Sequence, residues 1–459
     1  MTSYITITRV ARVAVMAAVG LAACVKTPDA ILSVRDPDII DPADVQSAAG
    51  ANAVRFGALA RLNAATTGNE GIILLGGLLA DEWRSGDSFV DRDQIDRRVI
   101  IRENGFATTA NRLLHRARLS ATQALDLLRT WAPTAPGWQL AEMYFVQAYV
   151  ENLMAEHYCS GLIFSRVVNG IEQYGTPITT AATLDLALAH ADSGLALITG
   201  TTVDDNRVRN ALMLARGRIL TNQDQPANAA TAVATVPTTF RYNMAHSQAT
   251  NDNQVWALNN NARRYNVSSG EGIVGIDFVT PADPRVPTCA GGTAPCTAAG
   301  VSATGTRTFD NNATPLFRAQ LLWPSRDSSV AILRGADARL IEAEAAFRAG
   351  NTGVGTGMLG ILNALRTTVT GLAPLADAGT DPARIDQLFR ERAFWQFGRG
   401  YRLGDLRRLM RQYGRAEAQV FPNGAFHKLG NYGNDVNFPI PQAEDNNPTA
   451  AGGCIDRLP

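Results

Sequence analysis

The residues best suited to ligand chemistry lie between Pro237 and Pro324, in a segment dominated by Asn, Thr, Gly and Pro. Aromatic rings can stack on the apolar face of a sugar, while amide, carboxylate and guanidinium groups bind its hydroxyls. An earlier loop adds a tryptophan beside Asp81 and Glu82. The candidate ligand-binding residues are Trp83, Trp256, Asn260, Arg264, Tyr265 and Trp323. Because a single tryptophan is more often part of a core, this set is a hypothesis.

Clustered charges near the C-terminus could serve acid–base chemistry, but we favour an architectural role. The cluster comprises Glu391, Arg392, Arg402, Asp405 and Arg407. Such groups can transfer protons, yet Arg–carboxylate pairs also fix how helix ends meet. The chain has no Gly-x-Ser-x-Gly elbow, phosphate loop or zinc-protease helix. We therefore expect no catalytic residues, although a hydrolase with a site that spacing does not reveal is an alternative, since glycosidase carboxylates pair in space.

Four of the five cysteines are expected to form disulfides, because an even number in an exported chain favours pairing. Cys289 and Cys296 flank a short Gly- and Pro-containing loop. We favour this pair, and hence Cys159 with Cys454, over the other two arrangements. A zinc site is the alternative, but the five histidines lie far apart and no Cys-x-x-Cys spacing occurs. No metal or cofactor is expected.

The remaining cysteine, Cys24, has the context of a lipid anchor. Arg9 and Arg12 precede an apolar run from Val13 to Ala23, which predicts a secretory signal peptide over residues 1–23. The run ends in Leu-Ala-Ala-Cys, the pattern in which the cysteine thiol accepts a diacylglyceryl group. The alternative is an ordinary cleaved signal with a chance cysteine. We predict lipidation of Cys24, followed by a tether over residues 24–42.

Charge and hydropathy exclude two other classes of protein. The chain has 42 basic and 42 acidic residues, and removal of the two signal-peptide arginines leaves 40 against 42. A balanced charge gives no support for nucleic-acid binding. The longest later apolar run, Gly71 to Ala80, has ten residues, of which three are glycines. A membrane-spanning helix needs about 20 apolar residues.

Helical periodicity dominates the parts of the chain that would position these residues. Helices are predicted over 43–66, 107–131 and 138–158. One face of the second carries Leu114, Ala117, Ala121, Ala124 and Leu128, at steps of three and four. Helix pairs are predicted over 207–237 and 337–368, with small residues that let paired helices approach closely, as in tetratricopeptide units.

These patterns predict a mostly α-helical protein in three regions. A helical tetratricopeptide-like region covers 43–236, a loop-rich insertion covers 237–325, and a second helical region covers 326–459. Short strands are expected in the insertion over 255–258 and 272–279. Long irregular segments of compact proteins are often functional, so the insertion is the candidate ligand-binding region.

Three separated segments resemble the SusD/RagB family of nutrient-binding lipoproteins. They are Asp337–Asn351 (DARLIEAEAAFRAGN), Arg390–Arg408 (RERAFWQFGRGYRLGDLRR) and Phe438–Pro448 (FPIPQAEDNNP). Their order and spacing agree with that family. Trp395 and Arg399 depart from its pattern, because they stand where the family usually has glutamates.

The resemblance implies a SusD-like helical body, held on the outer membrane and exposed at the cell surface. It also implies a SusC-like TonB-dependent transporter as partner, to which a captured oligosaccharide or peptide is delivered without chemical change. The rival hypothesis is a helical-repeat scaffold lipoprotein of envelope assembly. A long insertion that carries Trp and Asn residues favours the first hypothesis, since a scaffold has little need for it.

Overall fold

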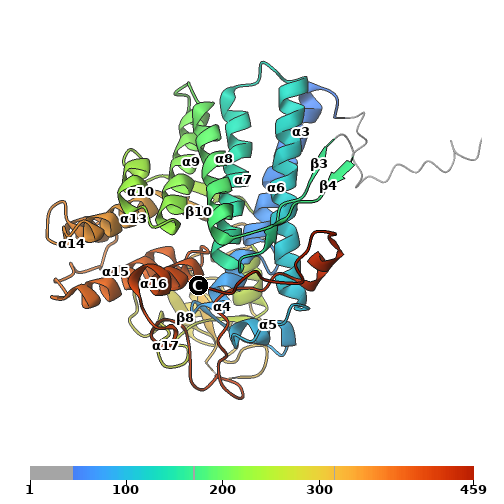
Figure 1. Cartoon of the computed structure of the whole chain (residues 1–459). Helices are drawn as coiled ribbons and strands as arrows, with labels where there is room; N and C mark the ends of the chain where they lie inside the picture. Colours follow the sequence, from blue (N-terminus) through green and yellow to red (C-terminus); the bar gives the residue numbers. More distant parts are fainter. Residues whose placement is uncertain (1–44, 169–170, 315) are drawn as a thin grey trace, which may run out of the picture.

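Helices are the main regular structure of the computed structural model (Figure 1), which describes residues 45–168, 171–314 and 316–459. The signal peptide, Cys24 and the tether lie outside the described residues. The prediction of a mostly α-helical chain is confirmed, because the strands of the described part are short and occur only in two-stranded pairs. No helix in that part is long and apolar enough to cross a membrane.

The first half of the described chain is a series of packed helices. They are α3 (Ala48–Thr67), α4 (Ile72–Leu79), α5 (Val90–Asp96), α6 (Gly105–Trp131), α7 (Gly137–His157), α8 (Thr180–Ala196), α9 (Val203–Asn222) and α10 (Pro226–Val233). The Asn104 side chain accepts the Ala107 N–H at the start of α6, which satisfies one of the unpaired amides of the first turn. The apolar face predicted for α6 is buried along its length.

Successive helices pack as neighbours, which is the tetratricopeptide-like arrangement that was predicted. Contacts join α6 with α7, α7 with α8, α8 with α9, and α9 with α10, and the first four of these helices run side by side in Figure 1. Small residues allow the close approach: a Cβ atom added at Gly217 of α9 would lie 2.4 Å from Cγ1 of Val233 in α10.

The second helical region packs back onto the first. It contains α13 (Gly335–Arg348), α14 (Met358–Arg366), α15 (Asp381–Gln396), α16 (Arg402–Tyr413), α17 (Glu417–Val420) and a 3-10 helix (Gln442–Asn446). Helix α16 contacts both α4 and α7. The buried Arg402 side chain donates to both oxygens of Asp81 at 2.6 and 2.7 Å. The two helical regions therefore share one core.

The insertion contains little regular structure, and one prediction for it is wrong. Strands were expected over 255–258 and 272–279, but α11 (Gln254–Trp256) runs into a π-helix (Ala257–Asn261), and the second segment has only an isolated bridge between Ser269 and Asp277. The Asn253 side chain accepts the Trp256 N–H at 3.0 Å and so starts a helical turn.

Paired strands hold the loops of the insertion to the helical body. These are β1 (Trp83–Ser85) with β7 (Tyr265–Val267) and β6 (Arg241–Met244) with β10 (Val330–Arg334). Within the insertion, β8 (Thr288–Ala290) pairs with β9 (Arg318–Gln320). Outside the insertion, β2 (Leu162–Ile163) pairs with β5 (Pro177–Ile178), and β3 (Arg166–Val168) pairs with β4 (Ile171–Gln173).

Both predicted disulfides are confirmed. Cys159 and Cys454 join the end of α7 to the C-terminal tail across 295 residues. Cys289 and Cys296 join β8 to the short helix α12 (Ala294–Ala298). The first bridge closes a very long loop, so it restricts the unfolded chain more than the second does.

Candidate functional site

The structure brings the two candidate segments of the sequence together. Strand β1, which carries Trp83, runs antiparallel to β7, which begins at Tyr265. The rings of these two residues meet edge to face, with centroids 6.4 Å apart. The early loop and the insertion therefore form one structural unit, although about 180 residues separate them in the chain.

Five of the six candidate ligand-binding side chains lie in the protein interior. They are Trp83, Trp256, Asn260, Tyr265 and Trp323. Trp83 packs against Phe397 at 4.9 Å, and the Asn260 amide donates to the Gln320 carbonyl at 2.7 Å. A ring that protein atoms enclose cannot stack on a sugar, so in this structure the five residues support the surface loops from below.

Arg264 is the candidate whose side chain reaches the surface. Its guanidinium carbon lies 5.2 Å from the ring of Phe89, whose surface is 50% exposed. Phe309, 37% exposed, lies beneath the guanidinium of the adjacent Arg263, at 5.0 Å. The predicted aromatic rings are buried, but neighbouring loops carry two other aromatic rings that are exposed. We call Phe89, Arg264 and Phe309 the three-loop surface.

Backbone hydrogen bonds fix the three loops against one another. Gly86 donates its N–H to the Arg264 carbonyl at 2.8 Å, and Asn312 donates to the Gly86 carbonyl at 2.8 Å. Arg263 follows the π-helix and has a φ of 57°, a conformation that non-glycine residues rarely adopt. Its guanidinium donates to the Phe309 and Asp310 carbonyls at 2.5 and 2.8 Å. The exposed rings thus stand on a rigid base.

A buried charge centre lies directly under this surface. Arg92 donates to Glu70 and Asp87, and Tyr265 donates to the same glutamate. The Arg92 guanidinium also lies 5.5 Å from the ring of Phe89. Burial, reinforced by the charge of Glu70, raises the pKa of Tyr265 well above its usual value, so the phenol keeps its proton. The network holds Phe89 in place from beneath.

Sequence reasoning missed Phe89 and Phe309. Phe89 follows the LADEW loop by six residues and is flanked by Ser88 and Val90, which gives no periodicity that would predict its exposure. One indirect indication was present in the sequence. The LADEW loop resembles a ligand-binding region, so the aromatic residues that follow it could have been included as candidates together with Trp83.

One cluster of possible metal ligands occurs among the described residues. Ligand atoms of Asp96, Glu271 and His427 all lie within 4.8 Å of one another. Asp96 accepts His427 Nε2 at 2.9 Å and the Ser85 N–H at 2.6 Å, and Glu271 accepts the Tyr432 hydroxyl at 2.5 Å. Burial, with the charge of Asp96, raises the pKa of Glu271. Hydrogen bonds within the protein account for this arrangement.

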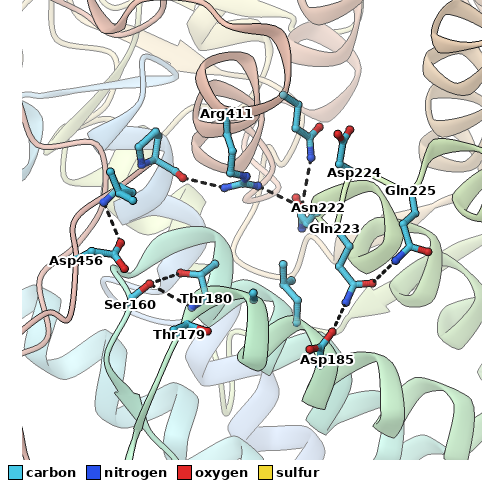
Figure 2. Close-up of a pocket in the computed structure, with 15 residues that line it drawn as sticks. Ser160, Thr179, Thr180, Asp185, Asn222, Gln223, Asp224, Gln225, Arg411 and Asp456 are labelled. Carbon is cyan, nitrogen blue, oxygen red and sulfur yellow. Dashed lines mark hydrogen bonds between the residues drawn. The ribbon is translucent and has the colours of Figure 1, made fainter.

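Two larger cavities lie elsewhere. Figure 2 shows one of about 600 Å³, between the start of α8, the α9–α10 turn, α16 and the C-terminal tail. Its polar groups largely satisfy one another, as where Gln223 donates to Asp185 at 2.8 Å and Arg411 donates to the Asn222 carbonyl at 3.3 Å. The other, of about 660 Å³, lies between α3, the first turns of α7 and α9, and β6.

Comparison with known proteins gives matches among solved structures only. No family model and no curated protein matches the chain. A SusD-like carbohydrate-binding protein from Bacteroides fragilis is 14% identical, with a TM-score of 0.62 over 88% of this chain and 98% of its own. A SusD-like carbohydrate-binding protein from Bacteroides vulgatus is 13% identical, with a TM-score of 0.56 over 78% and 83%.

A SusD/RagB family protein from Bacteroides thetaiotaomicron is 10% identical, with a TM-score of 0.60 over 86% of this chain and 94% of its own. At such identities the likeness establishes the fold. The SusD-like architecture that the three sequence motifs implied is confirmed over most of the chain.

Proposed function

We infer from the SusD-like fold, which spans most of this chain, that the protein binds a nutrient glycan and passes it on unchanged. The observation that carries the proposal is the three-loop surface, where exposed Phe89 lies against the half-exposed guanidinium of Arg264 and exposed Phe309 stands on an adjoining loop against Arg263. The SusD-like proteins from Bacteroides fragilis and Bacteroides vulgatus are described as carbohydrate-binding, which supports the same ligand class for this chain.

The three-loop surface has the chemistry of a sugar platform. Phe89 exposes half of its surface and can stack on the apolar face of a pyranose ring. Arg264 lies beside it with a weak ion pair to Asp87, at 3.8 Å, so its guanidinium can donate to sugar hydroxyls. Binding of this kind orders little of the protein, because the loops are already fixed by their backbone hydrogen bonds.

Phe89→Ala is expected to weaken glycan binding by about fivefold or more, since an aromatic ring that stacks on a planar ligand face contributes on the order of 1–3 kcal/mol. A glycan array identifies the ligand, and isothermal titration calorimetry then compares the variant with the wild type. Tyr174→Ala is the matched control, because Tyr174 is 48% exposed and Phe89 is 50% exposed, but Tyr174 follows the β3–β4 hairpin. Equal affinities for the two variants would show that the ligand binds elsewhere.

We propose further that Cys24 anchors the protein to the outer membrane beside a TonB-dependent transporter. The lipobox pattern supports the anchor, and the SusD-like fold supports the partner. Tagged wild-type protein should co-purify with a TonB-dependent barrel from solubilised outer membranes, and Cys24→Ser should appear in the soluble fraction. Recovery of envelope-assembly factors without a transporter would favour the rival scaffold function, and a membrane-bound Cys24→Ser variant would refute the anchor.

A further inference from the structure

The cavity between α3, α7, α9 and β6 combines aromatic and cationic side chains. We call it the helix groove. Trp138, in the first turn of α7, is partly buried, and Phe56 on α3 is 56% exposed. The guanidinium carbon of Arg55 lies 4.4 Å from the ring centre of Phe56 and 5.1 Å from that of Trp138. The positively charged guanidinium of Arg55 therefore lies against both aromatic rings of the groove.

A single buried carboxylate organises the wall of the helix groove. Glu142 accepts Arg55 Nη1 at 2.5 Å, Arg207 Nη1 at 2.6 Å and the Tyr242 hydroxyl at 3.1 Å. The Glu142 side chain is buried, so its negative charge is compensated by these arginines and is not presented to the cavity. Asp204, at the start of α9, pairs with the same Arg207 at 3.1 Å. Both lining carboxylates are thus committed to arginines of the wall.

Arg241 supplies a positive charge to the groove that these carboxylates do not neutralise. The ion pairs found among the described lining residues involve Arg55 and Arg207, whereas Arg241 lies exposed on β6. Its cross-strand partner on β10 is another arginine, Arg334. Burial lowers the pKa of Arg334 and of Arg399; the charge of Asp337 opposes this shift, and the nearby charge of Arg241 adds to it. Arg241 is therefore the lining arginine whose charge no lining carboxylate among the described residues offsets.

Two helices begin at the groove, and one of them adds to its positive charge. Trp138 and Asp204 lie in the first turns of α7 and α9, where the helix dipole is positive. The start of α9 is neutralised by its capping box and by acidic residues of its first turn, but the start of α7 has neither a side-chain cap nor an acidic residue there. The N-terminus of α7 therefore favours an anionic group near Trp138.

We propose that the helix groove is a second saccharide site that takes an acidic sugar, with Arg241 as its anion-binding residue and Trp138 and Phe56 as its stacking surface. The proposal rests on the function proposed above, and it assigns to this protein an anionic glycan class, carboxylated or sulfated. A volume of about 660 Å³ is within the range of pockets that hold small ligands. Asn243 is exposed in the same cavity and can bind sugar hydroxyls, whereas the side-chain amides of Asn63 and Asn251 already donate to Ala245 and Asn63.

Calorimetric titration with acidic and neutral tetrasaccharides tests the proposal on the full-length mature protein. The acidic probes are tetragalacturonate and the tetrasaccharides of chondroitin sulfate and heparin, and the neutral probe is maltotetraose. At least one acidic probe should bind the wild type tenfold or more tightly than maltotetraose in 50 mM salt. This preference should shrink in 500 mM salt, because ionic screening weakens exposed charge pairs.

Arg241→Gln should lower the affinity for that probe by about tenfold, as expected for loss of one charge-assisted hydrogen bond. Arg61→Gln is the matched control, because Arg61 is an exposed arginine of α3 that does not line the groove and its loss changes the net charge equally. Trp138→Ala should weaken binding as well, with Trp131→Ala as control, since Trp131 is 40% exposed at the end of α6. Thermal unfolding verifies that each variant is folded.

Two results would overturn the proposal. The first is failure of the wild type to bind any of the three acidic probes more tightly than maltotetraose. The second is equal affinity of Arg241→Gln and Arg61→Gln for the probe that binds. If Phe89→Ala, and not Arg241→Gln, abolishes binding of that probe, the acidic glycan occupies the three-loop surface; the proposed function then stands and the helix groove has no part in it.

Discussion

Asp405→Ala is expected to lower the free energy of unfolding by about 3–5 kcal/mol, because it leaves two buried arginines with one shared carboxylate, Glu344, where they had two. Asp405 accepts both Arg392 Nε at 2.7 Å and Arg392 Nη2 at 2.9 Å, and it accepts Arg408 Nη2 at 2.9 Å. All three side chains are buried. Burial alone would raise the pKa of Asp405, but Arg392 and Arg408 hold it at about 2.

Urea-induced unfolding at pH 7 measures the effect. Asp386→Ala is the control, because Asp386 pairs with Arg415 at 2.7 Å but leaves 68% of its side chain exposed. Exposed pairs of this kind contribute at most about 1 kcal/mol. A loss for Asp405→Ala no larger than that for Asp386→Ala would show that water reaches the arginines and that the cluster is not a buried network.

The same network shows what the charged side chains of the Arg390–Arg408 segment do. Glu344 on α13 accepts Arg408 Nη1 at 2.5 Å and so ties a third helix to the pair formed by α15 and α16. Arg407 donates to the carbonyls of Ala155 and Glu156 at the end of α7, at 2.8 and 2.6 Å. The motif side chains are therefore engaged in joining helices, which agrees with the architectural role that the sequence favoured.

The helices were predictable because their signal is local and repeated. The α6 face from Leu114 to Leu128 returns every three or four residues, so the sequence itself states which side is buried. The disulfides were predictable for a different reason: the seven-residue spacing of Cys289 and Cys296 leaves little chain to close, and pairing two cysteines determines the other pair.

The candidate site was less predictable because its exposure depends on contacts between distant segments. Trp256 and Trp323 stand in loops without periodicity, so the sequence does not state which way their rings face, and the structure buries both. Phe89 is exposed because Gly86 and Asn312 hold its loop against Arg264 through backbone hydrogen bonds. Such contacts use main-chain atoms that every residue has, and they leave no mark in the amino-acid sequence.

The pairing of charges in the helix groove was likewise not predictable from the sequence. Arg55, Glu142 and Arg207 come from three different helices, and their spacing in the chain gives no sign that one carboxylate serves two arginines. Arg241 becomes the uncompensated charge only once the others have paired. The net charge of the lining residues follows from the sequence, but its distribution between paired and available groups follows from the fold.

Glu82→Gln is expected to stabilise the protein at alkaline pH relative to the wild type. Glu82 is fully buried beside Asp81, and its Oε1 accepts the Gly398 N–H at 2.9 Å, while its Oε2 has no hydrogen-bond partner among the described residues. Burial raises the pKa of Glu82 to about 8, the Gly398 hydrogen bond partly opposes this, and the charge of Asp81 adds to it. The folded protein therefore holds a proton here that the unfolded chain releases near its ordinary pKa.

The sign of the pH dependence follows from the direction of this shift. Stability that the protonated carboxyl contributes is fully present below about pH 4.5 and is lost as the pH rises to about 8, at about 1.4 kcal/mol per pH unit. Glutamine has the same shape and does not titrate, so the stability of Glu82→Gln relative to the wild type should rise by a few kcal/mol between pH 5 and pH 9. Urea unfolding of both proteins at these two pH values measures that change directly. A stability difference that stays constant across this pH range would mean that Glu82 is ionised in the folded protein. Water would then have to reach the carboxylate at its contact with Gly398.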